Sequence, residues 1–357
     1  MMEKIPLRNL HNRVNRRELK ARIQESAEPR VTLSYYKYVT LPDPQLFRDH
    51  LFRVYQPLGV LGRIYVAREG VNAQLSVPAA HFAAFQAVME EMAFFKNLRL
   101  NVAVEDDGKS FFALIIKVRE KIVTDGIDDP NFDPAQTGTH LQAEEWNRLT
   151  DDPATIVVDM RNHYESEVGR FENAITPDAA TFREELPLVA ELLEDKKDHK
   201  ILMYCTGGIR CEKASAYMRY RGFENVFQLE GGIIEYARQV EAKGLKNKFL
   251  GKNFVFDERL GERISPDVIA HCHQCGAPAD DHTNCANHHC HILFIQCASC
   301  RARYADFCSD FCRDFSTLTA EAQKAQAPTM VFNGSKSGKG NYKAFRRSGA
   351  ALLRQTQ

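Results

Sequence analysis

The first third of the chain alternates between strand-like and helix-like patterns of apolar positions. β-Branched and aromatic side chains dominate residues 31–41, which predicts a strand, and apolar residues recur with helical spacing soon afterwards. The pattern predicts a strand over residues 31–41, a helix over 44–59 and two short strands within 62–78 that meet at Glu69 and Gly70. A helix over 79–95 and a strand over 111–124 follow, so the order is strand, helix, strand, strand, helix, strand. This order predicts a ferredoxin-like α+β domain over residues 31–126.

A second pattern begins after a segment dense in Asp, Pro and Gly, which predicts a linker over residues 127–140. Short apolar runs then alternate with amphipathic runs, which indicates a parallel α/β domain over residues 141–246. The predicted strands are 155–160, 200–205 and 225–232, and the predicted helices are 182–194, 211–222 and 233–244.

The remaining segments differ in composition from these two domains. Residues 1–30 are polar and basic and predict a helical or loose extension, whereas residues 247–315 form a module rich in Cys and His. Residues 316–357 predict a basic flexible tail, which has no acidic residue from Phe332 onward. Its basic and aromatic residues would suit an arm that contacts nucleic acid, or simply a solvated tail: Lys336, Lys339, Tyr342, Lys343, Phe345, Arg346, Arg347 and Arg354.

Overall composition narrows the class of protein. The 357 residues hold 47 Lys and Arg against 47 Asp and Glu, so no global charge favours nucleic acid or a membrane surface. No apolar run approaches the ~18 residues of a membrane span, and the basic start lacks the apolar core of a secretory signal. We therefore expect a cytoplasmic protein without a membrane partner, in which the ten cysteines are reactive or metal-bound thiols rather than disulfides.

Cys205 is the candidate nucleophile. It follows the apolar run 200–204, and the carboxyl ends of parallel strands are where open α/β sheets build their sites. Gly207 and Gly208 permit a turn whose N–H groups form an anion cradle over Thr206–Ile209, at the positive end of the next helix. With the charge of Arg210, this cradle would favour the thiolate. The alternative is a buried structural cysteine before a glycine turn.

The eight remaining cysteines form four close pairs, which suits two tetrahedral thiolate sites. The pairs are Cys272 and Cys275, Cys285 and Cys290, Cys297 and Cys300, and Cys308 and Cys312. Spacing allows either interleaved or consecutive pairing, and neighbouring histidines could replace a cysteine. Structural zinc is the preferred interpretation. An iron–sulfur cluster is less favoured by this spacing, and a group of reduced thiols packed together is the alternative.

Three ordered motifs resemble the rhodanese domain: "VVDMRNHYESEVGRFENAI", "YCTGGIRCEKAS" and "GFENVFQLEGGIIEY". The resemblance implies that Cys205 carries a persulfide or related sulfur state, in a six-residue loop shorter than that of the related phosphatases. Asp159 and Arg161 match the first motif. They would form either a salt bridge that orients groups beside the loop or a turn that stabilises the fold. Cys211 is a resolving thiol or a packing residue. Glu165 is expected to be a solvated carboxylate at a helix start, with a general base as the less favoured alternative.

The chain from about residue 31 to residue 312 also resembles one branch of this superfamily, the tRNA uridine hydroxylases. The flanking segments "GRIYVAREGVNAQLSVP", "KVREKIVTDGI" and the cysteine-rich "CHQCGAP" and "TNCANHHCHILFIQCASC" carry this resemblance. It implies hydroxylation of the wobble uridine of tRNA at carbon 5, with molecular oxygen as co-substrate and Cys205 as the required cysteine. No organic cofactor is evident, and protein partners stay undetermined.

The first domain offers residues that suit RNA. Arg63, Arg68 and Lys117 are expected near strand ends, with Asn72 and Gln74 on a neighbouring strand. Its strand aromatics would stack on bases or fill the core: Tyr35, Tyr36, Tyr38, Phe111 and Phe112. Two other functions stay open at this point, a thiosulfate or persulfide sulfurtransferase that uses the same loop, and a non-enzymatic RNA-binding module.

Overall fold

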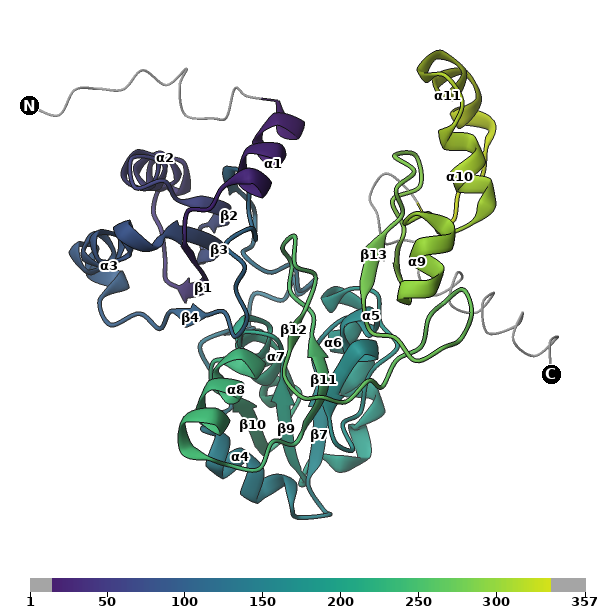
Figure 1. Cartoon of the computed structure of the whole chain (residues 1–357). Coiled ribbons are helices and arrows are strands. Elements are labelled where there is room, and N and C mark those ends of the chain that lie inside the picture. Colours follow the sequence, from purple (N-terminus) through teal and green to yellow (C-terminus); the bar gives the residue numbers. More distant parts are fainter. Residues whose placement is uncertain (1–14, 335–357) are drawn as a thin grey trace, which may run out of the picture.

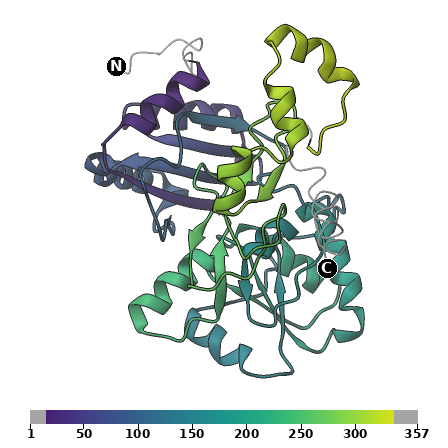
Figure 2. The same ribbon diagram turned by 45° about the vertical axis from the view of Figure 1, so that its right-hand side comes forward.

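The structure is a computed structural model that describes residues 15–334, so the tail residues from Lys336 onward lie outside it. An N-terminal α+β domain sits above a central α/β domain, and a cysteine-rich module stands beside them (Figures 1 and 2). The chain enters through helix α1 (Arg16–Glu25), whose first turn is capped by the Asn15 side chain. No helix of the described residues is long and apolar enough to cross a membrane. The predicted mixed α/β class, with its three parts, is confirmed.

A five-stranded sheet forms the N-terminal domain, in the order β4-β1-β3-β2-β5. The strands are β1 (Arg30–Tyr38), β2 (Leu61–Ala67), β3 (Gly70–Pro78), β4 (Asn101–Val102) and β5 (Leu114–Val118), and the helices are α2 (Pro44–Tyr55), η2 (Ala79–His81), α3 (Phe82–Glu91) and η3 (Ala93–Phe95). The segment predicted as the last ferredoxin-like strand is instead the extra strand β5, which runs parallel to β2 at one edge. Strand β4 takes the ferredoxin-like place beside β1. With only two residues, it leaves no period-2 pattern in the sequence.

The two faces of this sheet differ in polarity. Leu33 and Tyr35 point into a core that the two helices cover, and the Tyr35 hydroxyl meets that of Tyr55 at 2.7 Å. Tyr35 is therefore a core residue and not a free stacking platform. The alternate positions, such as Ser34 and Tyr36, lie on the opposite face, because successive strand residues point to opposite sides. This polar face lines a cavity shared with the central domain.

The central domain is built on a parallel sheet in the order β6-β10-β9-β7. Its elements are β6 (Thr139–Leu141), α4 (Ala143–Thr150), β7 (Ile156–Asp159), α5 (His163–Val168), β8 (Gly169–Phe171), α6 (Phe182–Leu192), η4 (Glu194–Lys196), β9 (Lys200–Tyr204), α7 (Ile209–Tyr220), β10 (Asn225–Leu229) and α8 (Gly232–Lys243). The first two residues of β6 fall within the predicted linker, where their backbone pairs with β10.

The C-terminal part begins by completing the central domain. Strand β11 (Phe249–Asn253) pairs with β8 and with β12 (Glu262–Arg263), although residues from 247 onward were expected to belong to the cysteine-rich module. That module holds β13 (His282–Asn284), β14 (Leu293–Ile295), α9 (Ala298–Tyr304), α10 (Asp310–Ser316), α11 (Ala320–Gln326) and η5 (Ala327–Thr329). Helix α11 lies where a flexible tail was expected, and the Thr319 side chain caps its first turn.

Candidate active site

Cys205 lies directly after β9, at the carboxyl edge of the central sheet, as the position of the apolar run predicts. Its residue surface is 1% exposed, yet it lines a cavity of about 1340 Å³ between the N-terminal and central domains. Thr206, Gly207, Ile209 and Arg210 line the same cavity. The reactive loop therefore opens into an interdomain space rather than onto the outer surface.

Backbone N–H groups converge on the Cys205 sulfur. The N–H of Gly208 donates to Cys205 Sγ at 3.2 Å, and those of Arg210 and Cys211 also donate to it. Gly208 has φ +96° and caps α7, so a side chain there would be strained and would meet the Tyr36 hydroxyl at 2.9 Å. Gly207 has no left-handed φ, and an added Cβ would make only ordinary contacts. Only one of the two glycines is thus required by backbone conformation.

This environment acidifies the thiol. Burial works against ionisation of Cys205, but a hydrogen bond from the Cys211 thiol, the Arg210 charge and the backbone N–H groups outweigh it and lower the pKa to about 6. Burial and the neighbouring Cys205 raise the pKa of Cys211 well above its usual value. Of the two cysteines, Cys205 is therefore the thiolate at neutral pH and Cys211 the hydrogen-bond donor.

Arg210 does not face the sulfur as an isolated charge. Its guanidinium forks onto both oxygens of Glu165 at 2.8 Å, and the Glu165 side chain is fully buried. The expectation of a solvated Glu165 was therefore wrong. The reason is a partner 45 residues away, on a helix whose start faces α5. Glu165 also accepts from the N–H of Asn162 in a capping box, so it joins the first motif to the reactive loop.

A second buried carboxylate lies close to this pair. Both oxygens of Glu185, on α6, are buried without a hydrogen-bond partner among the described residues. Burial raises the pKa of Glu185 well above its usual value, against the opposing influence of the Arg210 charge. Burial therefore favours the protonated, neutral form of the Glu185 carboxyl. No pattern in the sequence marks Glu185, because a glutamate in the first turn of a helix is ordinarily solvated.

Asp159 and Arg161 form a salt bridge that is fully buried, with Arg161 Nη2 2.6 Å from Asp159 Oδ2. Arg161 also donates to the carbonyl of Gly169, and the Tyr204 hydroxyl donates to Asp159 at 2.7 Å. These contacts fix the ends of β7, β8 and β9 beneath the loop. Neither residue lines the cavity.

The last rhodanese-like motif supports the loop from below. The N–H groups of Ile233 and Ile234 donate to the carbonyls of Cys205 and Thr206 at 3.0 and 3.2 Å. A Cβ at Gly232 would lie 2.5 Å from the Cys205 carbonyl oxygen, so only glycine permits this approach. The start of α8 thus fixes the backbone of the reactive residue.

The N-terminal domain also contacts the reactive loop, which sequence analysis did not predict. Asn101 donates from Nδ2 to the Gly207 carbonyl at 3.2 Å, and the Tyr38 hydroxyl donates to that of Ile209 at 3.3 Å. The Tyr36 hydroxyl donates to Glu212 on α7 at 2.8 Å. Contacts between residues more than 100 positions apart leave no local pattern, so no sequence signal was available for them.

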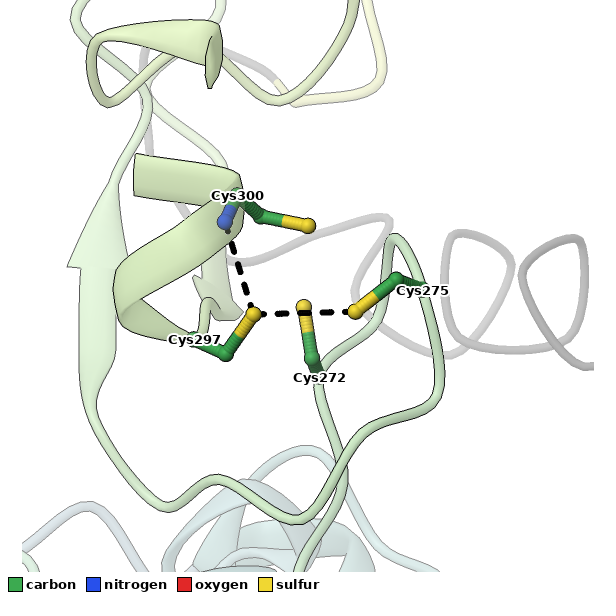
Figure 3. Close-up of side chains that lie close together, drawn as sticks. All are labelled: Cys272, Cys275, Cys297 and Cys300. Carbon is green, nitrogen blue, oxygen red and sulfur yellow. Dashed lines mark hydrogen bonds between the residues drawn. The ribbon is translucent and has the colours of Figure 1, made fainter. Parts of the chain in front are cut away.

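The eight clustered cysteines come together as two interleaved groups of four. One group holds Cys272, Cys275, Cys297 and Cys300, and the other holds Cys285, Cys290, Cys308 and Cys312. In each group, all the sulfur atoms lie within 4.8 Å of one another. Figure 3 shows the four sulfurs of the first group turned toward a common centre. Of the two pairings that spacing allowed, the structure has the interleaved one.

The geometry of both groups fits a tetrahedral metal ion. Metal–sulfur bonds of ~2.3 Å place the sulfurs of such a site about 3.8 Å apart. The sulfur atoms lie 3.6 Å apart in Cys275 and Cys297, 3.8 Å apart in Cys290 and Cys308, and 3.6 Å apart in Cys308 and Cys312. All four members of the second group are buried, as expected of a structural site closed by protein ligands.

Three family models match successive parts of the chain. The "UPF0176 acylphosphatase like domain" matches residues 30–122, the "Rhodanese-like domain" matches residues 142–239, and the "Rhodanase C-terminal" matches residues 250–313. Some of the solved structures that match cover less than a third of this chain. They include the rhodanese-like domain of an Anabaena protein, which is 19% identical with a TM-score of 0.26, over 32% of this chain and 80% of its own. A rhodanese-like domain protein of Staphylococcus aureus is 22% identical with a TM-score of 0.23, over 28% of this chain and 90% of its own.

Curated relatives match nearly the whole chain. A tRNA uridine(34) hydroxylase of Pectobacterium carotovorum is 58% identical over 333 residues, which are 92% of this chain and 94% of the relative. The tRNA uridine(34) hydroxylase of Yersinia enterocolitica is 56% identical, over 92% of this chain and 95% of its own length. At this identity and coverage, the protein described above belongs to the tRNA uridine(34) hydroxylase family.

Proposed function

We propose that this protein hydroxylates carbon 5 of the wobble uridine of tRNA, with Cys205 as the reacting thiol. Membership of the family supports the reaction. The observation that carries the role of Cys205 is its sulfur, which receives N–H groups of its own loop and lines the interdomain cavity. A tRNA substrate implies a cytoplasmic location, where a thiolate also escapes disulfide formation.

The reaction requires a balanced source of oxygen and electrons. Molecular oxygen, two electrons and two protons convert the C5–H bond of uracil into C5–OH and release one water. We propose that the Cys205 thiolate adds to carbon 6 of uracil, which makes carbon 5 nucleophilic, so that carbon 5 forms a bond to molecular oxygen and, with one proton, a C5 hydroperoxide. A thiol reductant cleaves the O–O bond, which leaves C5–OH and water while two thiols become a disulfide. Loss of the C5 proton then expels the Cys205 thiolate as the C5–C6 double bond re-forms. The competing route oxidises the sulfur first, through a persulfide-derived oxidant or a cysteine hydroperoxide. Trapping a Cys205–RNA adduct under turnover distinguishes the first route from the second.

Within this proposal, the residues around Cys205 have separate tasks. The loop amides of Gly208, Arg210 and Cys211 hold the sulfur as an anion before and after it attacks. Arg210 supplies positive charge beside the sulfur, and Glu165 fixes the position of its guanidinium. Asp159 and Arg161 act as structural supports, because they do not reach the cavity.

We propose that both four-cysteine groups hold structural zinc. The sulfur separations given above suit tetrahedral coordination, and four protein ligands leave no open position for catalysis. Zinc bound in this way would stabilise the module, which has only short strands and helices of its own. Metal analysis of the purified full-length chain tests this assignment.

Sulfurtransfer is the second candidate function, because the same six-residue loop would serve it. It predicts thiocyanate from thiosulfate and cyanide, whereas hydroxylation predicts a tRNA nucleoside heavier by one oxygen. The deciding experiment expresses the wild type or Cys205→Ala in cells that lack the family's activity and analyses tRNA nucleosides by mass spectrometry. Product with the wild type alone supports the proposal. If Cys205→Ala restored the product, the thiol would have no role in the reaction; if the only reaction of the protein were thiocyanate formation, hydroxylation would be excluded.

A further inference from the structure

The polar face of the N-terminal sheet forms one wall of the cavity. The reaction proposed at Cys205 gives the side chains of this wall no task. Gln74 is paired in register with both Ser34 and Arg63, so these three side chains form a row across the sheet. Tyr65 lies in the next row of the same face, beside Asn72. Ser34, Arg63, Tyr65, Asn72 and Gln74 all line the cavity that Cys205 lines, while helices α2 and α3 cover the opposite face of the sheet.

Three arginines that line the cavity have no carboxylate partner among the described residues. Arg63, Arg119 and Arg183 line the cavity, are exposed, and form no ion pair with any residue between 15 and 334. By contrast, two other arginines of the cavity pair with carboxylates. Arg210 lies 2.8 Å from the carboxylate of Glu165, and Arg259 lies 2.6 Å from that of Asp257. Two exposed carboxylates, Glu120 and Asp128, also line the cavity, but they come from the segment that joins the two domains. Free guanidinium groups inside a cavity favour an anionic ligand such as a phosphate.

The same wall offers a stacking surface and an amide. The Arg119 guanidinium lies over the ring of Tyr65, 5.5 Å from its centre, and flat guanidinium and aromatic groups are the surfaces on which unpaired RNA bases stack. The Gln74 side chain makes no hydrogen bond to any other described residue, so its amide is available both to donate and to accept. A cavity of about 1340 Å³ exceeds the ~300–1,000 Å³ that holds a small ligand.

From these observations we propose that Arg63, Tyr65, Gln74 and Arg119 form a second nucleotide site. It binds the single-stranded nucleotide next to the one whose base reaches Cys205. The guanidinium groups hold its phosphate, the Tyr65–Arg119 pair stacks on its base, and Gln74 contacts the base edge. The inference rests on the proposed function for its ligand, because it takes the partner to be RNA.

The test measures RNA binding rather than turnover. The full-length chain carrying Cys205→Ser is titrated into a fluorescent anticodon stem–loop with uridine at the wobble position, over a range of salt concentrations. The double variant Arg63→Gln and Arg119→Gln should bind at least about tenfold more weakly, and its salt slope should fall by about 1.4, because two phosphate contacts to a single strand are lost. Tyr65→Ala should bind about 5- to 150-fold more weakly with an unchanged slope, whereas Tyr65→Phe should retain binding.

Arg53→Gln is the matched control, since Arg53 is an exposed arginine of α2 on the covered side of the same sheet. The same substitutions made with Cys205 intact should leave the pH profile of Cys205 alkylation unchanged, which shows that each variant is folded. If the double variant and Tyr65→Ala bind RNA as Arg53→Gln does, the second nucleotide site is wrong, whether or not the enzyme hydroxylates uridine. If they lose binding while the wild type forms no hydroxyuridine, the site stands and the proposed reaction fails.

Discussion

Lys213 of α7 places its ammonium 2.8 Å from the carboxylate of Glu69, which belongs to the turn between β2 and β3 of the N-terminal domain. The same ammonium contacts Asp125, in the segment that joins the two domains, and the side chains of Lys213 and Asp125 are each 2% exposed. The helix that starts at the reactive loop is thereby fixed to both the N-terminal domain and the connecting segment. The candidate active site is therefore an interdomain structure rather than a property of the rhodanese-like domain alone.

Replacing this lysine tests the interdomain contact. Lys213→Met leaves the buried Asp125 with Lys121 as its remaining cationic partner, and losing one member of a buried pair costs about 3–5 kcal/mol of unfolding free energy. Lys96→Met, at an exposed lysine, should cost almost nothing. Urea denaturation measures both. An unfolding free energy of Lys213→Met within about 1 kcal/mol of the wild type would contradict a structural role for this contact.

The pH dependence of that cost has a definite sign. Burial works against ionisation of Asp125, but Lys121, Lys213 and a backbone N–H outweigh it and lower its pKa. A lowered carboxyl pKa stabilises the fold above the pKa of the unfolded chain, and this stabilisation is lost as pH falls through the folded value. The difference between the wild type and Lys213→Met should therefore be largest at neutral pH and shrink on acidification. A difference that grew as the pH fell would contradict the assignment.

Alkylation of Cys205 should follow a titration centred near pH 6, because only the thiolate reacts. Cys211→Ala removes the side-chain donor to Cys205 and should raise the pKa of Cys205, whereas Cys211→Ser keeps a donor and should raise it less. Iodoacetamide labelling followed by mass spectrometry of the Cys205 peptide gives the profile, despite ten cysteines in the chain. Identical profiles for the two variants would show that Cys211 does not hold the sulfur.

Glu165 and Arg210 should shift the same profile in opposite directions. Glu165→Gln removes the carboxylate that shares the guanidinium, so the full charge of Arg210 acts on the sulfur and the pKa of Cys205 should fall. Arg210→Met removes the positive charge and leaves Glu165 buried, so the pKa should rise and the protein should lose about 3–5 kcal/mol of stability. Shifts of the same sign in both variants would contradict this electrostatic account.

Metal removal should affect the cysteine-rich module first. We expect two zinc ions per chain by mass spectrometry of metals, one in Cys290→Ser, and early unfolding of the module in the presence of a strong chelator. Cys211→Ser is the matched control, because Cys211 lies outside both groups, and it should retain two ions. A wild-type chain without bound metal would leave the four-cysteine groups as packed thiols.

Local patterns in the sequence were sufficient for the strands β1, β2, β3, β7, β9 and β10 and for the position of Cys205 after β9. They failed where the deciding partner is distant. Strand β4 is too short to show a periodic pattern of apolar residues. The four cysteine pairs have similar spacing, so the sequence allows two ways of grouping them, and only the folded structure distinguishes the two. Glu165 is a polar residue at a helix start, where a side chain is usually solvated. Its partner Arg210 lies 45 residues away, so no local pattern predicts the ion pair. The contacts of Asn101 with the loop and of Tyr36 with the helix that follows it depend on how the two domains dock, so the sequence could not predict them.

The central claim is that a Cys205 thiolate, held by its loop amides beneath the interdomain cavity, hydroxylates uridine with molecular oxygen. Its most direct test supplies ¹⁸O₂ to cells whose only copy of this activity is the wild-type protein or Cys205→Ala, and measures the mass of the wobble nucleoside in their tRNA. The account predicts a hydroxyuridine that carries the oxygen label with the wild type, and unmodified uridine with Cys205→Ala. Labelled product in the variant, or unlabelled product in the wild type, would contradict it.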